Sequence, residues 1–335
     1  MHVHFPLFPI RCNRLRLPVL YLVLFIVLFL TGCSKRLQPV SATGFYYDTV
    51  ITITLYDPDS KPLLDECMQL ASHYENLFSP TVEGSDIQRI NTNPGSFVTV
   101  DDDTLSLIKT ALSYAELSNG IVTPSIGALS SLWNFGSDNT QQIPAQTAIE
   151  NALTHIDYRC IEVKGNQVRL TDPDASIDLG FIAKGFIADR MKEYLLSEGV
   201  TSGLINLGGN LVAIGSKPDG GPFKIGIQKP FESSGTAALT LDLTDISVVS
   251  SGNYERYFLQ NGVLYHHILS VETGYPVKSG LSQVTILCTD STAADALSTL
   301  CFTLGYEKAV RLLEEYPDVQ AVFITEDGQI LYHNF

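Results

Sequence analysis

The amino-acid sequence predicts a mixed α/β fold of the α+β type, in which helices flank mixed or antiparallel sheets. Helical and strand patterns occur along the same chain, and most strand patterns fall in its second half. The pairs Asn261-Gly262 and Asp327-Gly328 are turn signals typical of antiparallel hairpins. Many hairpins argue against an all-parallel, doubly wound sheet. No Walker loop or G-x-G-x-x-G motif is present, so a P-loop enzyme or a Rossmann dehydrogenase is not supported.

The first part of the chain predicts one strand and three helices. Residues 49–56 alternate between apolar and polar side chains, as a half-buried strand does. Apolar residues recur at helical spacing in 61–78, 104–119 and 182–198. Gly120 and Gly199 follow the last two patterns, where a glycine commonly ends a helix.

From residue 203 onward the chain predicts a strand-rich part that contains two helices. The predicted strands are 203–207, 211–215, 223–229, 237–243, 246–251 and 281–288, together with a hairpin of 255–260 and 263–268. Helices are expected at 292–304 and 306–316, and a hairpin around Asp327-Gly328 closes the chain.

The hairpin around Asn261-Gly262 places a cation beside a histidine. A two-residue loop sets Arg256 opposite His267 on the same face of the hairpin. A neighbouring positive charge favours the neutral imidazole, which is the form that can act as a base. The adjacent His266 points to the other face, so the two histidines make a poor zinc pair.

The N-terminus predicts an exported lipoprotein. Arg11, Arg14 and Arg16 precede an apolar run at 17–30, which is short for a membrane span and typical of a signal peptide. The sequence Leu30-Thr31-Gly32-Cys33 resembles a bacterial lipobox, which implies cleavage before Cys33 and lipid attachment to its thiol. The expected organisation is a signal peptide at 1–32, the lipidated Cys33 and a tether at 33–43, and one domain at 44–335. A retained N-terminal anchor is the alternative, and both place the remainder outside the cytoplasm at a membrane.

Charge and cysteine content exclude several classes of function. The formal net charge is −15, and removing residues 1–32, with three arginines and no acids, makes it −18. Such an acidic protein is unsuited to nucleic acid, which demands a basic face. Cys67, Cys160, Cys288 and Cys301 show no zinc spacing, and the sequence selects no disulfide pairing among them.

Asp295 lies in a helical pattern that is small or apolar almost all the way round. Such a helix is normally buried, and a buried carboxylate must be paired, hydrogen-bonded or bound to a metal. Thr299 follows one turn later on the same face, so two hard oxygen donors suit Mg²⁺ or Ca²⁺. The alternatives are an ion pair with a buried arginine or a cap on a neighbouring helix.

Three further segments carry residues that a simple scaffold would not need. The segment Asp178–Phe186 combines an acid, Gly180, Gly185 and Lys184 at a helix entry, where free N–H groups can bind anions; Asp178 could equally be an N-cap. The loop 206–210 is either a plain turn or a close approach to a ligand. With the segment 250–256 and Asp295, the set suits metal-assisted phosphoryl or pyrophosphate chemistry.

Read in order, these segments resemble the ApbE family of FAD:protein FMN transferases from about Gly44 to the C-terminus. The resemblance rests on Tyr47-Asp-Thr49, Phe78-Ser-Pro80, Ser85–Asn91, Thr123–Leu129, Leu132–Gly136, Asp178–Phe186, Leu204–Asn210, Ser251–Arg256, His267-Ile268, Thr273–Pro276 and Ala294–Thr299.

The resemblance implies that FMN is transferred from FAD to a threonine or serine hydroxyl of a target protein, that AMP leaves, and that Mg²⁺ bridges the phosphates. It implies an ApbE-like fold with the active site in a cleft between two lobes. Asp295, Thr299 and the Ala183 carbonyl would be metal ligands, and His267 the general base. The residues expected to bind FAD are Tyr47, Thr81, Ile121, Val122, Thr123, Asp178, Gly180, Lys184, Phe186 and Ile268.

The chain departs from the family pattern at three of these positions. Family members usually carry an aromatic residue and then an acid where this chain has Val122 and Thr123. They often carry a tyrosine where this chain has Thr81. These changes affect the expected FAD pocket and leave the metal ligands and His267 untouched.

Two other functions share most of these features. One is an Mg²⁺-dependent pyrophosphatase that splits FAD into FMN and AMP with water. The other is a lipoprotein that binds FAD without catalysis, which would need no base at His267. For a transferase, the resemblance implies an exported or membrane-bound acceptor, such as a subunit of an ion-pumping oxidoreductase.

Overall fold

The computed structural model describes residues 1–2, 4, 38–136 and 142–335. Most of the predicted signal peptide, Cys33 and residues 34–37 of the predicted tether lie outside the described residues. Residues Pro39 to Phe335 form one unit, which contains four clusters of buried apolar side chains. Among the described residues, no helix is long and apolar enough to cross a membrane.

An eight-stranded antiparallel sheet organises the domain, with the strand order β1-β2-β6-β7-β10-β13-β14-β15. Its strands are β1 (Val40–Tyr46), β2 (Thr49–Leu55), β6 (Ser202–Leu207), β7 (Asn210–Gly215), β10 (Ser247–Gly252), β13 (Leu281–Cys288), β14 (Gln320–Thr325) and β15 (Ile330–His333). The α+β prediction is confirmed, and every paired strand of the described chain is antiparallel. The one parallel pairing there is an isolated bridge between Ile126 and Ser176.

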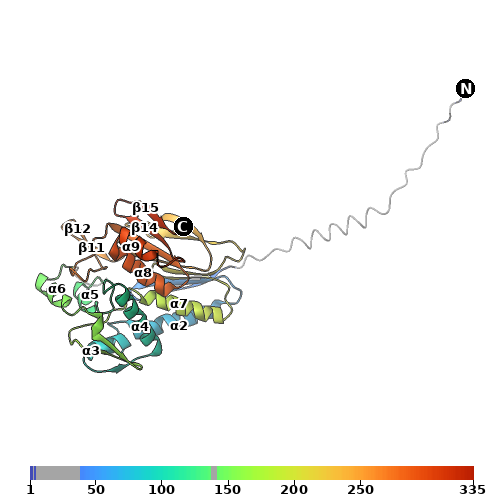
Figure 1. The fold of residues 1–335 in the computed structure, drawn as a ribbon. Coiled ribbons are helices and arrows are strands. Elements are labelled where there is room, and N and C mark those ends of the chain that lie inside the picture. The colour runs from blue at the N-terminus through green and yellow to red at the C-terminus, as the bar shows by residue number, and fades with distance from the viewer. Residues whose placement is uncertain (3, 5–37, 137–141) are drawn as a thin grey trace. The chain divides into compact units, whose positions relative to one another are not determined.

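Helices cover one face of this sheet, and a β-ribbon covers the other. These helices are α2 (Lys61–Phe78), α7 (Ala183–Ser197), α8 (Ser291–Leu304) and α9 (Tyr306–Leu313). Side chains alternate between the faces: Val249 and Ile286 pack with α8 and α9, whereas Val248 and Leu287 pack against the ribbon of β8 (Phe223–Gln228) and β9 (Ala237–Leu243). Figure 1 shows α7 and α8 side by side, and both pack on the central strands.

The remaining elements form smaller units around the sheet. They are α3 (Asp86–Thr92), α4 (Asp102–Leu117), α5 (Gly127–Trp133), α6 (Gln146–Leu153), the 3-10 helix η1 (Tyr158–Cys160), the sheet of β3 (Val98–Thr99), β5 (Gln167–Leu170) and β4 (Ile161–Lys164), and the hairpin of β11 (Tyr257–Gln260) and β12 (Val263–His266). The sequence predicted α4 and the β11–β12 hairpin. It predicted none of α3, α5, α6 or β3–β5, because segments this short carry too few periods for a pattern to stand out.

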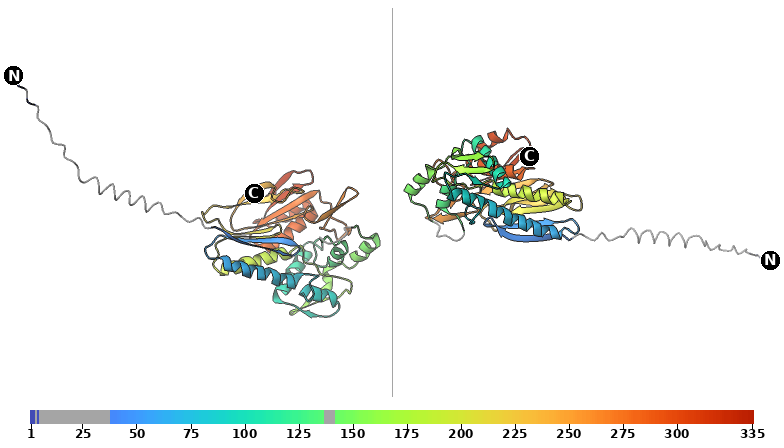
Figure 2. Two further views of the ribbon diagram at one scale, coloured as in Figure 1. Left: turned by 180° about the vertical axis from the view of Figure 1, so that it is seen from behind. Right: turned by 90° about the horizontal axis from the view of Figure 1, so that it is seen from below.

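The predicted tether is wrong at its C-terminal end. It was expected to run to residue 43, but β1 begins at Val40 and pairs with β2, with Val40 opposite Leu55. Val40 and Ala42 pack against the main core, so alternating burial draws these residues into the sheet. Figure 2 shows the β1–β2 hairpin beside α2, on which it packs. The folded domain therefore includes part of the segment expected to be a linker.

The four cysteines of the described domain are buried and free. They are Cys67, Cys160, Cys288 and Cys301, and burial raises the pKa of each thiol. They act as small core residues in this fold.

Candidate active site

Asp295 lies where α7 and α8 approach most closely. Its Oδ2 accepts a hydrogen bond of 2.9 Å from the Gly185 main-chain N–H, and Lys184 Nζ lies 3.8 Å from Oδ1. A Cβ at Gly185 would lie 2.2 Å from the Ser291 carbonyl oxygen, so only glycine allows this approach. Asp295 therefore has both partners that the sequence analysis considered as alternatives to a metal. It pairs with a cation, which is Lys184 and not an arginine, and it caps the first turn of a neighbouring helix, which is α7.

The pKa of Asp295 is raised, because burial outweighs the stabilisation from Lys184 and the Gly185 N–H. Its side chain is only 3% exposed. The Lys184 ammonium at 3.8 Å and the main-chain N–H groups of Lys184 and Gly185 do not offset the burial of this carboxylate, which makes it a candidate to bind a cation.

The other two predicted metal ligands lie on the same two helices as Asp295 and its partner Gly185. Thr299 follows one turn later, and its Oγ1 lies 3.1 Å from Ser251 Oγ, which is 2.7 Å from Ser298 Oγ. Ala183 is the first residue of α7, in the turn that Asp295 contacts. A carboxylate, a hydroxyl and a main-chain carbonyl are donors that Mg²⁺ prefers.

His267 has the environment of a neutral base. The predicted hairpin register is confirmed, with Tyr257 opposite His266, and the His267 N–H donates to the Arg256 carbonyl at 3.0 Å. Burial, followed by the charge of Arg256, lowers the pKa of His267 to about 3. Its Nδ1 is buried without a hydrogen-bond partner in the described part of the chain. The ring is therefore uncharged at neutral pH.

His266 has a structural environment instead. Its Nε2 lies 3.0 Å from the Val277 carbonyl oxygen, and its ring meets Phe302 edge-on at 5.7 Å between centroids. Burial lowers its pKa to about 4. The two histidines point to different surroundings, as the strand alternation predicted.

Glu255 is a site residue that the sequence analysis did not identify, although it lies within the segment 250–256. Burial raises its pKa to about 7; Lys184 opposes this shift and Asp295 adds to it. Its side chain is nevertheless accessible to solvent. Protein therefore surrounds the carboxyl on most sides, and one side stays open to solvent.

The loop 206–210 reaches the same region through Gly209. This glycine has a φ of +95°, and a Cβ there would lie 3.4 Å from Glu255 Oε1. This is an ordinary contact distance, so it places the loop beside Glu255 and does not distinguish a plain turn from a ligand-binding loop.

Arg256 connects the hairpin to the β1–β2 turn. Its guanidinium donates a 3.0 Å hydrogen bond to the Tyr47 carbonyl oxygen. Tyr47 is itself fixed, because its N–H donates to Glu75 at 2.8 Å and its hydroxyl donates to the Ala71 carbonyl. Tyr47, predicted to contact FAD, thus lies beside the cation that flanks His267.

A second group of predicted residues gathers around Asp178. Its main-chain N–H donates to the Pro124 carbonyl at 2.8 Å, and its Oδ2 accepts from Ser130 Oγ at 2.6 Å. Its Oδ1 accepts a hydrogen bond of 2.8 Å from the Gly180 N–H. Gly185, whose N–H donates to Asp295, follows five residues later in the chain. Since α7 begins only at Ala183, Asp178 is not the N-cap of that helix.

Several residues predicted to contact FAD have side chains that pack in the core or contact neighbouring residues. The Phe186 ring is 5% exposed and packs edge-on against Tyr74 and Phe78. Thr81 is exposed after the end of α2, where its Oγ1 lies 3.2 Å from Ser79 Oγ. Four others are partly or fully buried: Ile121 half-buried, and Val122, Thr123 and Ile268 at 5%, 3% and 6% exposure.

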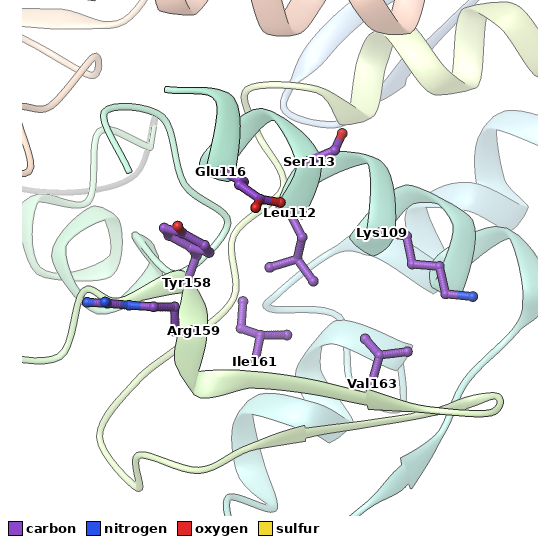
Figure 3. A pocket seen from close by; sticks show the side chains of 8 residues that line it. All are labelled: Lys109, Leu112, Ser113, Glu116, Tyr158, Arg159, Ile161 and Val163. Atoms are coloured by element: carbon purple, nitrogen blue, oxygen red, sulfur yellow. The ribbon is translucent and has the colours of Figure 1, made fainter. Parts of the chain in front are cut away.

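Two other features lie apart from these residues. A shallow cavity of about 530 Å³ lies between α4 and the start of β4, where Leu112, Ile161 and Val163 point toward one another (Figure 3). None of the predicted site residues lines it. His155, Asp172 and Asp174 also gather, but the ion pair of 2.9 Å between His155 and Asp172 accounts for that group.

Comparisons with known proteins show the family of this chain. The sequence model of the ApbE family matches residues 47–323. An FAD:protein FMN transferase of Treponema pallidum is 37% identical over 89% of this chain and 88% of its own, and one of Klebsiella pneumoniae is 36% identical over 84% and 87%.

Solved structures show the same fold. The ApbE protein of Thermotoga maritima superposes with a TM-score of 0.82 at 34% identity, covering 88% of this chain and 96% of its own. The flavin transferase ApbE of Vibrio cholerae gives 0.78 at 26% identity, covering 88% and 96%. From its sequence, its fold and the arrangement of Asp295, Lys184 and His267, this chain belongs to the ApbE family.

Proposed function

We propose that this protein is an FAD:protein FMN transferase, an enzyme that moves FMN from FAD to a hydroxyl group of an acceptor protein. The observation that carries the proposal is the pairing of two unlike groups near Lys184: the incompletely compensated carboxylate of Asp295 and the neutral imidazole of His267. A protein that only bound FAD would need neither a cation site nor a base. Membership of the ApbE family supports the same reaction.

Asp295, Thr299 and the Ala183 carbonyl would hold Mg²⁺, which neutralises negative charge on the pyrophosphate oxygens when it is bound. Lys184, at the entry to α7, adds a positive charge beside Asp295. The protein carries a formal charge of −15, so an anionic substrate requires this local positive charge. Oxygen donors of this kind favour Mg²⁺ over softer metals.

The reaction is a displacement at the phosphorus atom on the FMN side of the pyrophosphate. The acceptor hydroxyl oxygen forms the new P–O bond, the bond to the bridging oxygen breaks, and AMP leaves with that electron pair. His267, which its lowered pKa keeps neutral and able to accept a proton, takes the proton of the hydroxyl. Positioning and charge stabilisation supply most of the rate enhancement.

The acceptor in this proposal is a threonine or serine of an exported or membrane-bound redox protein, such as a subunit of an ion-pumping oxidoreductase. The lipobox at Leu30–Cys33 supports that compartment: lipid on Cys33 would hold the enzyme at the outer side of a bacterial membrane.

One experiment tests the proposal against its alternatives. The chain from Ser34 onward is incubated with FAD, Mg²⁺ and an acceptor domain that carries an exposed threonine, and intact masses are measured. We expect an acceptor heavier by one FMN, together with free AMP. Free FMN and AMP with an unmodified acceptor would make the protein a pyrophosphatase. Unchanged FAD that stays bound would make it a flavin-binding lipoprotein.

A further inference from the structure

Three hydroxyl groups form a hydrogen-bonded chain beside the candidate metal ligands. Thr299 Oγ1 lies 3.1 Å from Ser251 Oγ, and Ser251 Oγ lies 2.7 Å from Ser298 Oγ. The chain ends at the Asp295 main-chain carbonyl, to which the Ser298 hydroxyl donates at 2.9 Å. Ser251 is 8% exposed and Ser298 is fully buried. The chain therefore connects Thr299 with Asp295, the two residues whose side chains are expected to bind Mg²⁺.

Ser251 is the one member of this chain that does not belong to α8. It lies on β10, two residues after Val249, and residues two apart in a strand share a face. Val249 belongs to the apolar cluster that β10 and α8 build together, so Ser251 also faces α8. Its neighbour Ser250 points to the other face of the sheet, where its Oγ lies 2.8 Å from Thr285 Oγ1. Strand alternation thus places the Ser251 hydroxyl against the helix of the candidate site.

The Thr299 side chain does not make the hydrogen bond that hydroxyl groups in helices usually make. A serine or threonine inside a helix often donates to the main-chain carbonyl three or four residues earlier. Ser298 and Thr303 do so in α8, since they donate at 2.9 Å to the carbonyls of Asp295 and Thr299. The hydrogen-bond partner of Thr299 Oγ1 within the described part of the chain is Ser251. Ser251 thus gives the Thr299 hydroxyl a partner outside its own helix.

The order of the three contacts determines the direction of their protons. Each hydroxyl has one proton to donate, and a carbonyl oxygen can only accept. When the Ser298 proton goes to the Asp295 carbonyl, Ser298 Oγ accepts from Ser251, and Ser251 Oγ accepts from Thr299. In the opposite direction the Ser298 proton would go to Ser251, and the bond to the carbonyl would be lost. All three hydrogen bonds form only when Thr299 donates to Ser251.

This direction prepares Thr299 Oγ1 to bind a cation. Once its proton is donated to Ser251, the oxygen keeps both lone pairs free of hydrogen bonds to the described residues. A hydroxyl binds a metal ion through a lone pair, and a proton that pointed at the ion would be repelled by its charge. Groups that orient a metal ligand in this way typically change metal affinity by about 10–100-fold.

We propose that Ser251 is a positioning residue for the metal site: it accepts the Thr299 hydroxyl proton and so keeps the lone pairs of Thr299 available to Mg²⁺. Ser298 fixes the Ser251 hydroxyl in turn, because its own proton is held by the Asp295 carbonyl. This inference rests on the proposed function, which supplies the metal. It adds a residue of β10 to a site whose expected ligands come from α7 and α8.

The test measures Mg²⁺ binding by calorimetric titration, with and without FAD and in the absence of an acceptor protein. The variants are Ser251→Ala, Thr299→Val and the double variant Ser251→Ala/Thr299→Val. Ser250→Ala is the matched control, because Ser250 is a partly buried serine of the same strand whose Oγ also has two side-chain partners, Thr285 and Gln283. Urea midpoints without Mg²⁺ report any general loss of stability.

Ser251→Ala should weaken Mg²⁺ binding by about tenfold, the lower end of the range for residues that orient a ligand. Thr299→Val should weaken it at least as much. The double variant should bind Mg²⁺ no more weakly than Thr299→Val alone, because Ser251 acts through Thr299. Ser250→Ala should keep the wild-type Mg²⁺ affinity, and FAD affinity measured by fluorescence without Mg²⁺ should be the same in all of these proteins.

Wild-type Mg²⁺ affinity in Ser251→Ala overturns the inference and leaves the proposed metal site intact. An equal loss of Mg²⁺ affinity in Ser250→Ala also overturns it, because a general loosening of β10 would then be the cause. Additive losses in the double variant overturn it as well, since Ser251 would then act without Thr299. Absence of Mg²⁺ binding in the wild type instead contradicts the metal site of the proposed function, and the inference falls with it.

Discussion

Gly185→Ala offers the sharpest test of how α7 and α8 build the site. The new Cβ would lie 2.2 Å from the Ser291 carbonyl oxygen and 2.8 Å from Asp295 Cβ, where an ordinary contact is 3.4–4 Å. The obstructing Ser291 atoms belong to the backbone and cannot rotate away. The two helices must therefore separate by about 1 Å at this point.

This separation should have two measurable effects. Overpacking a core costs about 1–3 kcal/mol, and placing alanine for glycine in a helix returns about 1 kcal/mol. With rigid backbone in the way, we expect a net loss of about 2 kcal/mol in the free energy of unfolding. The ligands expected from α7 and α8 also move apart by more than the ~0.2 Å that Mg²⁺ coordination tolerates, so Mg²⁺ affinity should fall at least about tenfold.

Urea unfolding gives the first quantity, and calorimetric titration of the FAD-bound protein with Mg²⁺ gives the second. Gly136→Ala is the matched control, because its Cβ would meet only Asn134 Oδ1 at 3.4 Å. An unchanged urea midpoint in Gly185→Ala would refute the close approach of the helices. A destabilised variant with wild-type Mg²⁺ affinity would refute the placement of the metal between α7 and α8.

Three further predictions concern the charged groups. Asp295→Ala should lose Mg²⁺-dependent FMN transfer; full activity at ordinary Mg²⁺ concentrations would contradict its role as a ligand. His267→Ala should still bind FAD, by fluorescence titration, but transfer no FMN, and a variant that transfers normally would exclude it as the base. For Glu255, the folded-state pKa of about 7 lies above the ordinary 4.5, so its stabilising effect is present below pH 4.5 and lost as the pH rises to 7. Without metal, the urea midpoint of the wild type should therefore decline relative to Glu255→Gln across that window, and parallel midpoints would contradict the shift.

Local patterns were sufficient for much of the fold and for the position of His267. The Asn261-Gly262 turn fixes the hairpin register by counting, and that register alone places Arg256 opposite His267. The apolar surroundings of Asp295 likewise predicted its burial. Both inferences needed only the geometry of a single element.

The sequence could not predict which groups compensate Asp295 or where the Phe186 ring lies. Lys184 and Gly185 reach Asp295 because two helices more than 100 residues apart pack together, and no local pattern encodes that contact. Phe186 lies only two residues from Lys184 in the chain, yet its ring points into the core against Tyr74 and Phe78. Proximity along a helix therefore does not imply a shared face, since a two-residue step turns the side chain by about 200°.

Gln228 and Phe231 show most clearly where pattern-based reasoning fails. By composition the segment 229–236 is a polar loop with a proline and a glycine, and a glutamine before it looks like an ordinary surface residue. In the structure, however, the Gln228 side-chain amide forms hydrogen bonds with four main-chain groups of this loop. The same loop holds Phe231 at a positive φ, and neither contact follows from a local sequence pattern.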